Sequence, residues 1–160
     1  ENTMFGGNVG DYFIHRNIAN IVPSKNDKDK NIQTLSAIEY AIKVLKIPNL
    51  FILGHSNCGG VEYSYKTLKD KKNINDFEYI NQWTSCLQNS YNNIPNDLSE
   101  TEKIIFFEQE NIKQSIKNLR EYDFIDKSIN ENKLNVVGLW FQINSGLIKF
   151  LDNNSFIDLD

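Results

Sequence analysis

The sequence has 160 residues, of which 40% are hydrophobic and 24% are charged, a composition typical of one ordinary globular domain. Its formal net charge is −4 and its lysines are dispersed among acidic residues, which argues against a nucleic-acid partner. No apolar run approaches the length of a membrane span and no secretory signal is recognisable, so we expect no membrane partner.

The cysteine content indicates a reducing compartment. Cys58 and Cys86 are too few for a disulfide framework, so we expect a cytoplasmic location. A disulfide between the two is not excluded by the sequence.

The first elements are predicted to be a turn and a short strand. Gly6 to Asp11 is rich in residues that tolerate positive φ, and Tyr12 to Arg16 reads as a strand. Arg16 has two interpretations. It is either a surface or salt-bridged arginine, or a planar fork that binds a small carboxylate or carbonate-like anion.

A helix and a buried strand follow. An apolar stripe at spacings of three and four predicts a helix from Thr34 to Leu45, which Pro48 closes. The run from Leu50 to Leu53 shows no alternation, as expected of a strand buried on both faces of a parallel sheet. A helix followed directly by such a strand is one half of a βαβ unit.

The segment Gly54-His55-Ser56-Asn57-Cys58-Gly59-Gly60 carries the chemistry that stands out most. We expect Gly54 to end the strand, and Gly59 and Gly60 to allow positive φ. His55 and Cys58 offer a nitrogen and a sulfur donor, a pair that suits zinc, at the strand end where α/β sheets bind ligands. A zinc site needs three or four ligands, however, and Cys58 could instead pack as a small hydrophobic residue.

The rest of the chain predicts further helices and a closing pair of strands. Ser99 and Glu102 have the spacing of a capping box at a helix start. The expected helices span Val61–Lys69, Phe77–Tyr91, Ser99–Leu119 and Phe124–Asn132, and the expected strands span Lys133–Phe141 and Leu147–Leu151, the last two paired as a hairpin. Nothing indicates a second domain.

Several of these segments together resemble one known family. The segment from Gly54 to Gly60 looks like the zinc-binding signature of the β-class carbonic anhydrases. Gly10 to Asn20, Ser36 to Ala41 and Val137 to Leu147 are similar to other segments of that family, in the same order along the chain. Motifs in register are far more specific than His-x-x-Cys alone.

The resemblance implies a fold and an activity. The fold would be one α/β domain over residues 1–160, with a mainly parallel central sheet flanked by helices and a C-terminal antiparallel hairpin. The activity would be zinc-dependent, reversible hydration of carbon dioxide to bicarbonate. His55 and Cys58 would be ligands of Zn2+, and Phe13 and Tyr40 would line the substrate pocket, largely across a subunit interface. Gly59 would contribute backbone to the site.

The resemblance also concerns assembly and regulation. A pocket built from two subunits implies a homodimer or a homotetramer. Arg16 matches an arginine that helps to bind bicarbonate at a regulatory site in one branch of the family. Phe141 stands where that branch has a tyrosine, which argues against such regulation.

One motif of the family is missing. A Cys-x-Asp-x-Arg motif on the first strand should supply the third zinc ligand and an Asp–Arg dyad beside the metal, so this chain has no expected catalytic residue of its own. Cys86 is a poor substitute because it lies in a predicted helix. Either the chain is N-terminally incomplete and lacks its first strand, which we favour, or it is a degenerate relative.

Three other functions stay open. A non-catalytic, zinc-free relative would serve as a binding or scaffold subunit, and a related zinc hydrolase would act on carbonyl sulfide or carbon disulfide. A nucleotide-binding domain fits least, because Gly54 to Gly60 matches neither a P-loop nor G-x-G-x-x-G.

Overall fold

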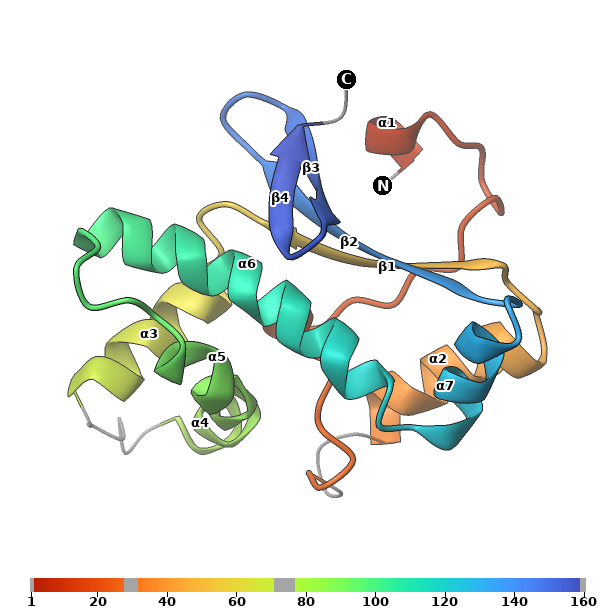
Figure 1. Cartoon of the computed structure of the whole chain (residues 1–160), viewed down its shortest axis with the longest axis horizontal. Coiled ribbons are helices and arrows are strands. Elements are labelled where there is room, and N and C mark those ends of the chain that lie inside the picture. The colour runs from red at the N-terminus through yellow and green to blue at the C-terminus, as the bar shows by residue number, and fades with distance from the viewer. Residues whose placement is uncertain (1, 28–31, 71–76, 159–160) are drawn as a thin grey trace.

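The computed structural model describes residues 2–27, 32–70 and 77–158 (Figure 1). Its elements follow in the order α1 (Asn2–Phe5), the 3-10 turn η1 (Ile18–Asn20), α2 (Ile32–Lys43), β1 (Asn49–His55), α3 (Gly59–Asp70), α4 (Glu78–Thr84), the 3-10 turn η2 (Ser85–Leu87), α5 (Gln88–Asn92), α6 (Glu100–Leu119), α7 (Asp123–Asn130), β2 (Asn135–Gln142), β3 (Leu147–Asp152) and β4 (Ser155–Asp158). None of these helices is both long enough and apolar enough to cross a membrane.

The strands form one mixed sheet in the order β1-β2-β3-β4. β1 and β2 are parallel, with Gly54 opposite Trp140 and His55 opposite Phe141. The pairs β2–β3 and β3–β4 are antiparallel. The α/β class and the C-terminal hairpin are thereby confirmed, with the parallel part of the described sheet limited to β1 and β2.

Helix α6 crosses the parallel strands β1 and β2 and packs against both of them (Figure 1). It begins with the predicted capping box, in which the Ser99 side chain and the Glu102 side chain each accept from the other's backbone N–H. A Cβ added at Gly54 would stand 2.8 Å from Ile112 Cδ1, and one added at Gly138 would stand 3.0 Å from Ile112 Cγ2. The two glycines therefore let α6 approach the strands closely.

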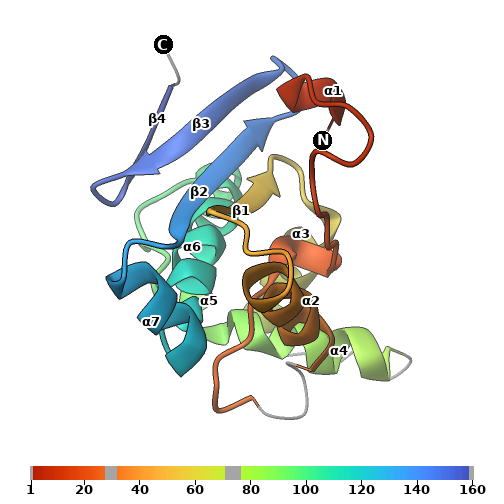
Figure 2. The same cartoon turned by 90° about the vertical axis from the view of Figure 1, so that its right-hand side faces the viewer.

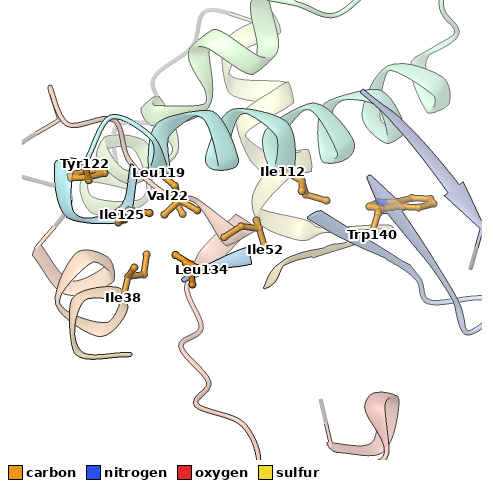
Figure 3. Packing of buried hydrophobic residues seen from close by; sticks show 9 residues of the cluster. All are labelled: Val22, Ile38, Ile52, Ile112, Leu119, Tyr122, Ile125, Leu134 and Trp140. Carbon is orange, nitrogen blue, oxygen red and sulfur yellow. The ribbon is translucent and has the colours of Figure 1, made fainter. Parts of the chain in front are cut away.

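The main hydrophobic core lies along one side of α6 (Figure 3). It combines residues of α2, α6, α7, β1 and β2 with residues of the connecting segments: Val22, Ile38, Ile52, Ile112, Leu119, Tyr122, Ile125, Leu134 and Trp140. The segment before α2 is held against α6 by hydrogen bonds as well, since Asn118 Nδ2 donates to the Val22 carbonyl (2.7 Å) and Tyr122 donates to the Pro23 carbonyl (2.9 Å).

A second hydrophobic cluster lies beyond the carboxyl end of β1, under α3 and α5. It contains Ala19, Ile21, Cys58, Val61, Tyr65, Leu87 and Phe107. A Cβ at Gly60 would stand 2.6 Å from Ile18 Cγ2, so the start of α3 packs directly on η1. Since Phe107 also lies on α6, this helix joins the two clusters.

The predicted strand from Tyr12 to Arg16 is wrong. These residues form an extended segment outside the described sheet, and Phe13 and Ile14 are exposed. These apolar, β-prone residues pair with no strand among the described residues, so propensity alone does not make a strand.

The predicted burial of β1 on both faces is also wrong. Ile52 is 7% exposed beneath α6, whereas its neighbour Phe51 is 49% exposed on the other face. Helix α1 lies on the side of the sheet away from α6 (Figure 2). Phe5 of α1 stacks on Phe51 with ring centroids 6.4 Å apart. Gly54 does not end the strand, which continues to His55.

Other boundaries shift modestly. The helix predicted from Phe77 to Tyr91 is divided into α4, η2 and α5, while the predicted final strand is followed by an additional one, β4. The polar connections predicted at Ser24 to Asn31 and Lys66 to Asn75 lie partly outside the described residues, and α3 extends to Asp70.

Candidate functional site

The candidate site is the turn that joins β1 to α3 and carries His55 and Cys58. Asn57 takes the left-handed conformation at φ 56°, which asparagine tolerates well. The Cys58 carbonyl accepts a bond from the Glu62 N–H at 2.9 Å, so Cys58 is the N-cap residue immediately before α3. The positive φ that the sequence placed at Gly59 or Gly60 lies at Asn57 instead.

Ser56 ties this turn to the end of β2. Its backbone N–H donates to the Phe141 carbonyl at 2.9 Å, and its hydroxyl accepts from the Ile143 N–H at 2.9 Å. Ser56 is 8% exposed, so both bonds are shielded from water. The turn is thereby fixed to a neighbouring strand on one side.

The His55 ring is oriented by its own turn. Its Nδ1 lies 2.9 Å from the Ser56 carbonyl oxygen. Since a carbonyl can only accept, Nδ1 carries the hydrogen, and Nε2 is left as the ring nitrogen with a lone pair. This is the tautomer in which a histidine can bind a metal through Nε2 while its other nitrogen is held.

Cys58 is 5% exposed and carries a free thiol within the second cluster. Its backbone N–H donates to Oε1 of Glu108 at 3.0 Å. The other carboxylate oxygen of Glu108, Oε2, accepts from Trp140 Nε1 at 3.2 Å. Burial raises the pKa of the Glu108 carboxyl above its ordinary value, while these two N–H donors act to lower it.

The turn carries two side chains of the kinds that bind zinc. A nitrogen and a sulfur donor three residues apart in sequence match the ligand types of zinc. Across residues 2–27, 32–70 and 77–158, however, no group of three His, Cys, Asp or Glu side chains is placed to hold one ion. His55 and Cys58 could therefore bind zinc only together with further ligands.

The other predicted site residues lie outside this turn. Phe13 and Tyr40 meet each other, with ring centroids 5.9 Å apart, and both are 49% exposed. Arg16 is exposed on the extended segment before η1. Gly59 is the first residue of α3, and a Cβ there would have no described heavy atom within 4 Å.

Sequence reasoning missed Glu108, Trp140 and the anchoring role of Ser56. The signal for Glu108 was available, because it precedes Ile112 by four residues and so falls on the apolar stripe of its helix. A charged residue on such a stripe needs a buried partner. That the partner is the Cys58 N–H depends on how α6 crosses the sheet, which the sequence does not reveal.

The architecture defines a class: α/β proteins with a His-x-x-Cys turn at the carboxyl end of a parallel strand. The family model described as carbonic anhydrase matches residues 1–148 of the chain. A relative named beta carbonic anhydrase 3 from Arabidopsis thaliana is 33% identical over 86% of the chain, and one named carbonic anhydrase from Helicobacter pylori is 29% identical over 92%. The chain belongs to the β-carbonic anhydrase family, a family of enzymes.

Solved structures agree with this assignment. A β-carbonic anhydrase from Sordaria macrospora, described as tetrameric, superposes with a TM-score of 0.80 at 33% identity, covering 100% of this chain and 76% of that one. The β-carbonic anhydrase CcaA gives a TM-score of 0.89 at 24% identity, covering 99% of this chain and 77% of that one, which supports the fold alone. The chain spans 54% of the Arabidopsis relative and 68% of the Helicobacter relative.

Proposed function

We propose that this chain is part of an enzyme that reversibly hydrates carbon dioxide to bicarbonate with the help of Zn2+. The observation that carries the proposal is the anchored turn, in which a correctly tautomerised His55 and a buried Cys58 thiol stand at the end of a parallel strand. It is supported by the family membership and by the names of the relatives, which are carbonic anhydrases.

His55 and Cys58 are the residues of this chain that would hold zinc, through Nε2 and the thiolate sulfur. Zinc in such a site supplies Lewis-acid chemistry that makes water a nucleophile near neutral pH. The chain's own contribution is to fix both donors before the ion arrives. Ser56 holds the turn to β2, and the Ser56 carbonyl keeps the imidazole hydrogen on Nδ1.

The remaining parts of the site are proposed to come from residues outside these 160. The third ligand and the Asp–Arg dyad expected of the family would lie on a strand beside β1. Two observations support this: the relatives are longer than the chain, and β1 is the last strand on its side of the described sheet. We propose on this basis that residues 1–160 belong to a domain that has a further strand before them.

Phe13 and Tyr40 are proposed to face the carbon dioxide pocket at a subunit contact. Two aromatic rings packed together and half exposed are what an interface would cover. A homodimer or a homotetramer is therefore proposed, in line with the description of the Sordaria relative as tetrameric.

Gly59 would leave open space beside the metal turn. Arg16, exposed, is proposed for a bicarbonate site, and the cytoplasm for the location.

One alternative has an observation in its favour. Because the described residues hold no group of three potential metal ligands, a zinc-free relative acting as a binding or scaffold subunit is the second candidate. A related hydrolase of carbonyl sulfide or carbon disulfide would use the same donors and differ only in its substrates.

The test uses protein made from the whole reading frame. Zinc content and stopped-flow hydration of carbon dioxide are measured on the same sample, with Cys58→Ser as the control. We expect about one zinc per chain, assuming the usual closed set of three protein ligands, and turnover that the control loses. Folded, zinc-free and inert protein would overturn the enzymatic proposal in favour of the scaffold role. Assays with carbonyl sulfide and carbon disulfide as substrates distinguish the related hydrolase from a carbonic anhydrase.

A further inference from the structure

Glu108 is a buried carboxylate whose position calls for an explanation. It lies on α6 and is 2% exposed. Its neighbour in the chain, Phe107, belongs to the second hydrophobic cluster, and Trp140, which donates a hydrogen bond to it, belongs to the main core. A carboxylate is almost never buried this completely without specific partners. Among its described partners are N–H donors: the Cys58 backbone to Oε1 and Trp140 Nε1 to Oε2, and the Asn57 backbone N–H also acts on the carboxylate.

The bond to Cys58 falls at a structurally sensitive point of the turn. Cys58 is the N-cap of α3, and the N–H of an N-cap residue has no partner within its helix. Asn57, immediately before it, is in the left-handed conformation. Glu108 therefore satisfies the backbone group that would otherwise be unpaired at the residue whose sulfur is the proposed ligand.

The turn is thus held from two directions. On the β2 side, Ser56 exchanges hydrogen bonds with Phe141 and Ile143. On the α6 side, Glu108 holds Cys58. The approach of α6 at Gly54 and Gly138 brings the carboxylate within reach.

We propose that Glu108 is a positioning residue that fixes the backbone at Cys58 and thereby aims the Cys58 sulfur and the His55 imidazole at one metal ion. The inference rests on the proposed zinc function. Glu108 acts through the Cys58 N–H and is not itself a ligand. Trp140 holds the second carboxylate oxygen and so fixes the rotation of the carboxylate plane.

The test compares Glu108→Gln with a control on the same helix, Asn111→Ala. Asn111 is 1% exposed and donates to the Ala19 carbonyl at 2.6 Å, so its loss damages the same buried side of α6 without touching the turn. In Glu108→Gln, the new amide NH2 must face either the Cys58 N–H or the Trp140 N–H. Because both groups are donors, one of the two hydrogen bonds is lost.

Three quantities are measured on protein from the whole reading frame: Zn2+ affinity by competition with a chromophoric chelator, the thiolate-to-metal absorption band after Co2+ substitution, and thermal stability. We expect Glu108→Gln to weaken Zn2+ binding about 10- to 100-fold, as loss of an outer partner of a ligand usually does, and to change the Co2+ band. Asn111→Ala should lower the thermal midpoint while both metal readouts stay as in the wild type.

A double variant separates the acceptor from the charge and also covers a misfolded single variant. In Glu108→Gln/Trp140→Phe the indole donor is gone, so the glutamine oxygen is free to accept from Cys58. Recovery of Zn2+ affinity relative to Glu108→Gln, or a folded double variant that binds Zn2+ like the wild type, supports the proposal. Unchanged affinity in Glu108→Gln, equal losses in Asn111→Ala, or no recovery in the double variant would overturn it.

One readout does not depend on zinc. In metal-free protein, the Cys58 amide should exchange its hydrogen faster in Glu108→Gln than in the wild type or in Asn111→Ala. A wild-type protein that binds no Zn2+ would overturn the proposed function, whereas equal Cys58 exchange in all three proteins would overturn the positioning role.

Discussion

The two faces of β1 differ sharply although they belong to the same seven residues. On the face beneath α6, Ile52 is 7% exposed and Gly54 is packed against Ile112. On the other face, Phe51 is 49% exposed. The turn that carries His55 and Cys58 is held to β2 and α6 by residues of this chain, whereas the exposed face of β1 and the proposed pocket residues Phe13 and Tyr40, each 49% exposed, would need a further part of the protein to cover them.

The largest expected effect comes from making a cavity on the face of β1 that packs beneath α6. Ile52→Ala should lower the free energy of unfolding by about 2–5 kcal/mol, because it leaves a cavity beneath α6. The matched variant Phe51→Ala, on the next residue, should cost less than about 1 kcal/mol, since the ring is half exposed and touches mainly Phe5. Urea unfolding of both variants measures the difference. Equal losses would contradict the contrast between the faces.

Overpacking the contact with α6 should have the next largest effect. Gly54→Ala places a methyl group 2.8 Å from Ile112 Cδ1, so the helix has to shift, at a cost of about 1–3 kcal/mol. Gly59→Ala is the control, because its methyl group would meet no described heavy atom within 4 Å. Thermal unfolding compares the two. A Gly54→Ala protein as stable as Gly59→Ala would show that α6 does not approach the strand so closely.

A loss of similar size is expected where polar side chains of α6 hold the segment before α2. Asn118→Ala removes the bond to the Val22 carbonyl and leaves that buried acceptor unpaired, at a cost of about 1–3 kcal/mol. Gln114→Ala, which removes the donor to Asn118 Oδ1 from a half-buried position, should cost less. Chemical denaturation ranks them, and the reverse order would argue against α6 as the anchor of this segment.

The smallest effect on folding is expected at the exposed aromatic pair Phe13 and Tyr40. Phe13→Ala and Tyr40→Ala should each change the free energy of unfolding of a subunit by no more than about 1 kcal/mol, because the rings are half exposed. If they lie at a subunit contact, the same variants should weaken self-association strongly. Sedimentation velocity over a range of concentrations measures this, and unaltered assembly would remove these aromatics from the interface.

The sequence predicted local features well. The capping box at Ser99 and Glu102, the helix before Pro48, the strand that leads to His55 and the closing hairpin each follow from short-range patterns, and each is present. The family resemblance, read from Gly54 to Gly60 and three further segments, is confirmed by the match over residues 1–148. The roles given to His55, Cys58, Phe13, Tyr40, Gly59 and Arg16 stay predictions.

What the sequence could not provide depends on contacts between distant segments. The strand predicted at Tyr12 to Arg16 fails because a strand needs a neighbouring edge, and propensity does not supply one. The two-sided burial of β1 fails for a related reason, since an apolar run shows that a strand can be buried but not what covers it. Glu108 meets Cys58 across 50 residues of chain, a pairing set by the crossing of α6 over Gly54 and Gly138.

The central claim is that the turn carrying His55 and Cys58 is formed before any metal binds, and amide hydrogen exchange of zinc-free protein from the whole reading frame tests it most directly. The Ser56 and Cys58 amides donate to the Phe141 carbonyl and to Glu108, so they should exchange as slowly as core amides of α6. The amides of Asn153 and Asn154, exposed in the turn between β3 and β4, serve as the fast reference. Exchange at Ser56 and Cys58 as fast as in that turn would mean that the turn carrying His55 and Cys58 forms only when the metal binds.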